Sequence, residues 1–189
     1  EAGDQREREY RECSGLPSLR QASIRDTLGG MDRRRVGLIL AAILVGAFAL
    51  RLGYVLSQRG DVLFEHPILD EDRYVQTARS LVAGHGEDRP YWQPPGIVYA
   101  LAATMEVAGP GLLAPRLVQV MLSVASCFLL FLVGRRLFSE RVGLAAAAIT
   151  ALHGVLVFEC GELLPATWLV FLELLARASE VGDGIGQRP

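Results

Sequence analysis

The feature that most constrains this chain is the apolar run VGLILAAILVGAFALRLGYVL at 36–56, in which Arg51 is the one charged residue. About 20 apolar residues in a helix cross the hydrocarbon core of a bilayer. Another run, at 142–158, carries no charged residue at all. The chain is therefore predicted to be an integral membrane protein. That excludes a disordered chain, a disulfide scaffold and a soluble globular enzyme.

The composition also indicates a membrane protein, because the charged residues are concentrated in one part of the chain. The chain is 51% hydrophobic and 21% charged, and residues 1–35 alone hold 15 of the 40 charged side chains. The net charge of −2 points to no nucleic-acid partner, and the absence of Lys is interpreted as a compositional bias. Cys13, Cys127 and Cys160 have no metal-ligand spacing, so we expect neither a metal site nor a structural disulfide from them.

The N-terminal stretch 1–30 is polar and has no apolar segment of the secretory type. Met31, followed by Asp32 and three arginines, is typical of the start of a bacterial membrane protein. We therefore expect Met31 to be the natural start and 1–30 to be a disordered leader that is not native. The alternative is a disordered cytoplasmic tail.

Charge flanking the apolar runs predicts the topology. Arg33 to Arg35 precede the first run and RRLFSER (135–141) follows another, so both should face the cytoplasm. The predicted fold is all-α: a polytopic helical membrane protein with a cytoplasmic N-terminus and amphipathic surface helices in its first external loop. Four transmembrane helices are expected, at 36–56, 112–134, 142–158 and 166–176.

Two segments of the external part should not cross. YVQTARSLVAG (74–84) places its apolar residues on one helical face, which suits a helix lying on the membrane surface. The apolar stretch 96–108 is 13 residues long, too short for a span. Beyond Arg177 the hydrophobic pattern stops, as if a longer membrane protein had been cut or frameshifted, and 178–189 is predicted to be a disordered tail.

Several polar residues are candidates for chemistry. The cluster Asp70-Glu71-Asp72-Arg73-Tyr74 either caps a helix N-terminus, or supplies a general base or a metal or substrate ligand. Arg51 and Arg116, near the outer ends of two spans, either extend to the interface or bind an anionic group.

Other polar and aromatic positions have simpler interpretations. The motif around Gln93 (YWQPPG) is typical of an interface anchor. His153, inside a run, is expected to be hydrogen-bonded within the bundle. Glu159 and Glu162 are either ordinary interface residues or part of the site. Under the predicted topology the acids, Arg116 and Glu162 all lie on the external face, where the head group of a lipid-linked substrate would sit.

The order of motifs resembles a known family. An N-terminal span is followed by DEDRY, a helix with ARSL, then PYWQPPG, APRL at the start of a span that ends in GRRLFSER, an Ala-rich span and GELLP. Over 31–177 the chain resembles the N-terminal part of the GT-C class of membrane glycosyltransferases, of the family thirty-nine type. That type includes protein O-mannosyltransferases and aminoarabinose transferases.

The resemblance implies inverting transfer of a hexosyl or pentosyl group, from a polyprenyl-phosphate donor to an acceptor hydroxyl outside the cytoplasm. The acceptor would be a lipid, a glycan or a protein. Asp70 would be the general base, Glu71 would position it or the acceptor, and Arg116 would hold the donor phosphate. The expected site is catalytic Asp70 and Glu71, with substrate-binding Arg73, Tyr74, Gln93, Arg116 and Glu162. No cofactor is required, although a divalent cation is possible.

This sequence also departs from the family. A Lys commonly precedes the paired prolines in aminoarabinose transferases, whereas Gln93 stands here. The family has many more spans than the four expected, which implies an inactive fragment in a bacterial inner membrane. Two alternatives are a small non-enzymatic membrane subunit or scaffold, and a transporter fragment; the external position of the acids counts against the transporter.

Overall fold

The computed structural model describes residues 32–85 and 93–186, and every regular element in these ranges is helical. Residues up to Arg35 and residues from Val36 form two separate units, and the packing below concerns the second. The elements are α3 (Arg33–Ser57), η1 (Gln58–Gly60), α4 (Val62–Glu65), α5 (Leu69–Val82), α6 (Pro95–Ala108), α7 (Leu113–Leu137), α8 (Glu140–Leu152), α9 (Gly154–Glu159) and α10 (Ala166–Gly186).

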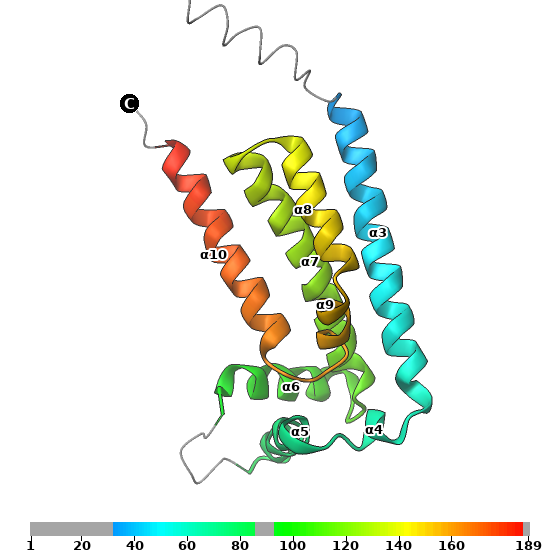
Figure 1. Ribbon diagram of the computed structural model, residues 1–189. Helices are drawn as coiled ribbons and strands as arrows, with labels where there is room; N and C mark the ends of the chain where they lie inside the picture. Colours follow the sequence, from blue (N-terminus) through cyan, green and yellow to red (C-terminus); the bar gives the residue numbers. More distant parts are fainter. Residues whose placement is uncertain (1–31, 86–92, 187–189) are drawn as a thin grey trace, which may run out of the picture. The chain divides into compact units, whose positions relative to one another are not determined.

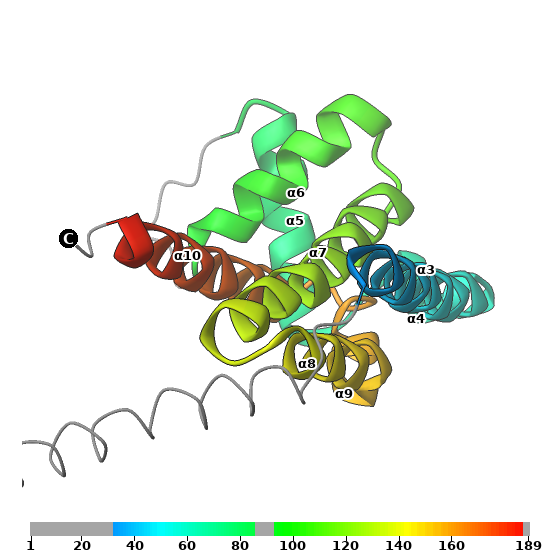
Figure 2. The same ribbon diagram turned by 90° about the horizontal axis from the view of Figure 1, so that it is seen from above.

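Helices α3, α7, α8 and α10 run side by side, and α5 and α6 lie across one end of the bundle. In Figure 1, α7 and α8 form the centre, with α3 and α10 on either side, while α5 and α6 lie below. Figure 2 shows the same helices from above, with α7 between α3 and α10. Two of the described helices are long and apolar enough to cross a membrane, at Arg33–Gly60 and Leu113–Leu137. These features confirm a helical membrane fold.

The other two predicted spans, 142–158 and 166–176, differ in the structure from their predicted form. The uncharged run 142–158 is not one helix: α8 ends at Leu152 and α9 begins at Gly154, with His153 in an extended conformation between them. The side chain of His153 is exposed, not hydrogen-bonded within the bundle as predicted. The last run forms α10, which is longer than the predicted span but does not meet the same length and apolarity test.

The helix at 69–82 also differs from its prediction. Its apolar face, which includes Tyr74, Val75 and Ala78, is buried within the protein instead of lying on the membrane. The partners are residues of α6 and two flanking loops: Ile97, Val98, Leu101, Met105, Leu112 and Leu163. An amphipathic face gains the same burial from another apolar helix as from a lipid surface, and the sequence pattern does not distinguish the two.

The last helix extends beyond the predicted span. α10 continues to Gly186, whereas the predicted span ends at residue 176 and the predicted disordered tail begins at residue 178. Near the start of that tail, Arg136 at the end of α7 donates to the Ala178 carbonyl oxygen at 2.8 Å. The predicted leader 1–30 and the start at Met31 lie outside the described residues.

Two glycines allow α7 and α8 to approach each other closely. A Cβ atom on Gly134 would lie 2.9 Å from the Gly143 Cα, and one on Gly143 would lie 2.7 Å from the Phe131 carbonyl oxygen. No side chain fits at this crossing without moving a backbone. Ser139 caps the start of α8 between them, accepting from the Val142 N–H at 3.3 Å.

Replacing Gly143 with Leu should therefore separate α7 from α8. Overpacking of this kind costs about 1–3 kcal/mol, measured as the free energy of unfolding in a denaturant titration of the detergent-solubilised chain. Gly46→Ala is the matched control, because a Cβ there meets nothing within 4 Å and Ala is the better helix former. Equal stability of the Gly143→Leu and wild-type chains would contradict the close packing.

Candidate functional site

A cavity of about 490 Å³ lies where α3 ends, between α4, the start of α5, the start of α7 and the loop after α9. Its polar lining includes residues from five different segments: Tyr54, Asp61, Asp70, Glu71, Arg116 and Glu162. Four of the seven predicted site residues are therefore brought together here: Asp70, Glu71, Arg116 and Glu162.

The centre of the site is a buried ion pair between α5 and α7. The Arg116 Nη2 donates to the Glu71 Oε1 at 2.9 Å, and the two side chains are only 4% and 11% exposed. The same Oε1 accepts from the backbone N–H of Leu163 at 3.2 Å. A guanidinium and a peptide N–H together therefore fix the position of the Glu71 carboxylate.

The other nitrogens of Arg116 are also engaged. Nε donates to the Gly161 carbonyl oxygen at 2.8 Å, and Nη1 donates to the Phe64 carbonyl oxygen at 2.6 Å. The guanidinium carbon lies 4.0 Å from the centre of the Phe64 ring, a cation–π arrangement. Arg116 thus links α4, α5, α7 and the loop after α9, and all three of its nitrogens already donate to protein acceptors.

Asp70 is placed differently from its neighbour. It lies in the first turn of α5 and is exposed, and its Oδ1 accepts from the Gln93 Nε2 at 3.3 Å. Within 32–85 and 93–186 no cation forms an ion pair with it. The residue before it, Leu69, has a φ of 59°, a conformation that a non-glycine residue rarely adopts. This turn directs consecutive carboxylates to different environments, one into the ion pair and one to the surface of the cavity.

Glu162 faces the ion pair from the loop after α9. Partial burial, followed by the nearby Glu71 carboxylate, raises the pKa of Glu162 above its usual value, and Arg116 lowers it by less. A hydrogen bond from α7 fixes this loop, because the Gln119 Nε2 donates to the Glu162 carbonyl oxygen at 2.6 Å. Glu162 and Glu71 therefore form a pair of acids that resists carrying two full negative charges.

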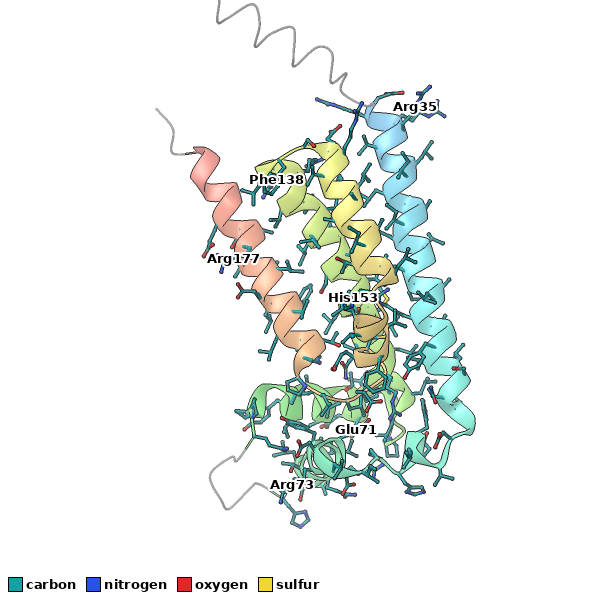
Figure 3. The ribbon with its side chains drawn as sticks, viewed as in Figure 1. Arg35, Glu71, Arg73, Phe138, His153 and Arg177 are labelled. Carbon is teal, nitrogen blue, oxygen red and sulfur yellow. The ribbon has the colours of Figure 1, made fainter. Side chains whose placement is uncertain are left out.

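The remaining predicted residues lie outside the cavity. Arg73 is exposed on the outer side of α5, away from Glu71 (Figure 3). Tyr74 is 4% exposed in the apolar core between α5 and α6. Gln93 does not line the cavity but reaches Asp70 by its side-chain amide.

The sequence interpretation did not identify several residues that shape the site. Phe64 supplies a carbonyl and a ring to Arg116. Asp61 caps α4 by accepting from the Leu63 N–H at 2.9 Å. Gly161 contacts Tyr54, because a Cβ on Gly161 would lie 2.8 Å from the Tyr54 Cε1. An Asp before a short apolar turn and a Gly in the GELLP motif were visible signals, but neither indicates which partner it meets.

A metal centre finds little support in the described residues. No group of three or more His, Cys, Asp and Glu side chains there has an arrangement that could hold a metal ion. Of the four carboxylates lining the cavity, Glu71 is committed to the ion pair, Glu162 faces Glu71, and Asp61 caps α4. The divalent cation stays a prediction.

A family model matches part of this chain. Residues 92–184 match the model of the dolichyl-phosphate-mannose-protein mannosyltransferase family, just under half of the chain. The chain carries a GT-C glycosyltransferase-like segment. The match includes Arg116 and Glu162, whereas Asp70 and Glu71 precede it. No curated protein and no solved structure gives a significant match.

Replacing Arg116 with Met should destabilise this GT-C-like segment strongly. Glu71 would remain buried without its cation, which costs about 3–5 kcal/mol, measured as the loss in free energy of unfolding in detergent. The matched control is Arg177→Met, which removes an exposed pair with Glu173 and should cause no measurable change. If both variants were equally stable, the buried pair would not hold the site together.

Glu162 should make stability depend on pH. Its folded-state pKa lies above the ordinary 4.5, so the unfolded chain releases this proton at lower pH than the folded chain does. The free energy of unfolding should therefore decrease as pH rises from about 4.5 through the folded pKa, and then level off. Glu162→Gln should lack that decrease, whereas Glu106→Gln, at an exposed position on α6, should keep it. Superimposable pH profiles of the wild-type and Glu162→Gln chains would contradict this assignment.

Proposed function

We propose that the cavity is the acceptor side of a GT-C type active site. The chain would take part in transferring a sugar from a polyprenyl-phosphate donor to an acceptor hydroxyl, with Asp70 as the general base. One observation carries the proposal. Two exposed carboxylates line the cavity without a cationic partner among the described residues, Asp61 and Asp70. Asp61 caps α4 by accepting from the Leu63 N–H, whereas in the described ranges Asp70 accepts only from the Gln93 side chain, and Arg116 lines the same cavity.

The contacts favour Asp70 over Glu71 as the base. The Glu71 Oε1 already accepts from Arg116 and from the Leu163 N–H, so this oxygen is occupied by protein donors. Glu71 would then act as a positioning residue that fixes Arg116. The exposed Asp70 carboxylate has room for a hydroxyl, and Gln93 orients one of its oxygens.

The reaction balances with a single carboxylate. The acceptor oxygen attacks the anomeric carbon while Asp70 takes its proton, and the bond from that carbon to the phosphate oxygen breaks with its electron pair. The phosphate leaves as an anion and needs no acid. Direct displacement inverts the anomeric configuration, unlike the two-carboxylate retaining route.

Arg116 would stabilise the charge that develops on the phosphate, as expected from the resemblance. Because its three nitrogens donate to protein acceptors, it would act through N–H groups not used in those bonds and through its field. Glu162 would help to position the acceptor. A neutral Gln93 in place of the Lys of aminoarabinose transferases favours a donor other than an aminoarabinosyl phosphate.

The orientation supports the same proposal. The cavity lies at the start of α7, and Arg135 and Arg136 lie in its last turn. The positive-inside rule places that last turn in the cytoplasm, which would put the cavity on the external side. We propose a bacterial inner membrane with a cytoplasmic N-terminus, and a lipid, glycan or protein as the acceptor.

Asp70→Asn should abolish transfer. The test uses a full-length enzyme that contains this segment, reconstituted in vesicles with radiolabelled polyprenyl-phosphate mannose and a mixture of hydroxyl acceptors. Loss of a general base lowers the rate by about 10²–10⁴-fold. The matched control is Asp72→Asn, two residues along α5, whose side chain accepts from Gln76 and does not line the cavity.

Two results would contradict the proposal. Equal losses in the two variants would mean that α5 is only structurally sensitive. Normal transfer by Asp70→Asn would exclude Asp70 as the base. If the wild-type full-length enzyme neither transfers mannose nor binds the labelled donor, the alternative of a non-enzymatic membrane subunit would be favoured.

A further inference from the structure

Arg51 is a completely buried charge in the second half of α3. Its Nε donates to the Ser123 Oγ at 2.8 Å on α7, and its Nη1 donates to the Ala151 carbonyl oxygen at 2.9 Å. Nη2 donates to the Thr150 carbonyl oxygen at 3.2 Å. Within the described part of the chain, no carboxylate forms an ion pair with it. Arg51 therefore neither extends to the interface nor faces an anionic ligand cavity.

Arg51 has three carbonyl partners, and two of them lie at the end of another helix. Nη1 also donates to the Ala47 carbonyl oxygen of its own helix at 3.3 Å, whereas Thr150 and Ala151 are in the last turn of α8, which ends at Leu152. In a continuous α-helix the Thr150 and Ala151 oxygens would accept from the N–H groups of Gly154 and Val155, four residues later. At the break the Thr150 oxygen accepts from the His153 N–H at 3.3 Å in addition to Arg51, and the Ala151 oxygen accepts from Arg51. Arg51 therefore supplies donors and positive charge at the negative end of the α8 dipole.

The local sequence does not explain why the helix stops there. The stretch 140–159 contains no Pro and is rich in Ala and Leu, which favour a helix. Gly154 has a glycine's flexibility, but a Cβ on it would meet nothing within 4 Å. His153 nevertheless has ψ of 109°, which ends α8. In a bilayer, unpaired backbone groups are costly, so a break in an apolar run needs partners from another segment.

We infer that Arg51 maintains the break between α8 and α9 by capping the C-terminal carbonyls of α8 from the neighbouring helix α3. The cation is neutralised by helix carbonyls instead of a carboxylate. The break fixes where α9 and the following loop begin, and this loop supplies the Gly161 carbonyl oxygen to Arg116. The inference concerns the architecture of the bundle and stands apart from the proposed transfer reaction.

Arg51→Met should convert the break into continuous helix, since without the guanidinium the two carbonyls are satisfied best by Gly154 and Val155. The chain has three histidines, so ¹³C-histidine labelling in detergent micelles gives few signals, and His153→Gln identifies the one at the break. In Arg51→Met the His153 ¹³Cα resonance should shift downfield and the ¹³Cβ resonance upfield, from extended to helical values. The matched control is Arg59→Met, at an exposed position in η1, which should leave both resonances unchanged.

A folded Arg51→Met chain whose His153 signals remain extended would overturn the inference. If that variant does not fold, Arg51→Lys decides. A lysine ammonium keeps the charge and can donate to both carbonyls, so His153 should stay extended. Helical His153 signals in Arg51→Lys would overturn the inference in that case.

Discussion

The ion pair between Glu71 and Arg116 is the interaction on which the cavity end of the bundle depends. It joins α5 to α7, and the further donations of Arg116 reach α4 and the loop after α9. Two charges removed from water are costly unless their remaining hydrogen-bonding groups are also satisfied. Here the Leu163 N–H and the carbonyls of Gly161 and Phe64 meet that need. The arrangement fixes four segments with one guanidinium, and so it shapes the cavity.

The bundle contains a second buried arginine, Arg51, whose charge is satisfied in a different way from that of Arg116. Arg116 has a carboxylate partner near the end of the bundle, whereas Arg51 within α3 is surrounded by a hydroxyl and helix carbonyls. An arginine at the centre of a transmembrane helix costs about 2.5–3.5 kcal/mol on insertion scales. The end of a helix offers partial negative charge without a second ion to desolvate. Both arginines therefore satisfy their charge by joining segments that are distant in the sequence.

Much of this could be predicted from residues and their spacing. The apolar runs and Arg clusters indicated a helical membrane protein, and α3 and α7 are long and apolar enough to span. The motif order indicated the GT-C type, which the family match over 92–184 supports. The acids and Arg116 were recognised as one site because the topology placed them on the same face. Tyr74 and Arg73 were included because they adjoin the acids in sequence, yet helical geometry turns them to the core and to the outer surface.

The sequence by itself determined that this chain enters a membrane as helices, and it predicted that Asp70, Glu71, Arg116 and Glu162 lie together at one end. Both follow from local properties, since apolar length and flanking charge act over one segment at a time. Only the tertiary structure decided that Glu71 is the committed acid and Asp70 the accessible one, and that the 142–158 run is broken at His153. The reason is that each outcome depends on a donor from a remote segment. Arg116 follows Glu71 by 45 residues, and Arg51 precedes Ala151 by 100. A local sequence pattern does not indicate a partner at such a distance along the chain.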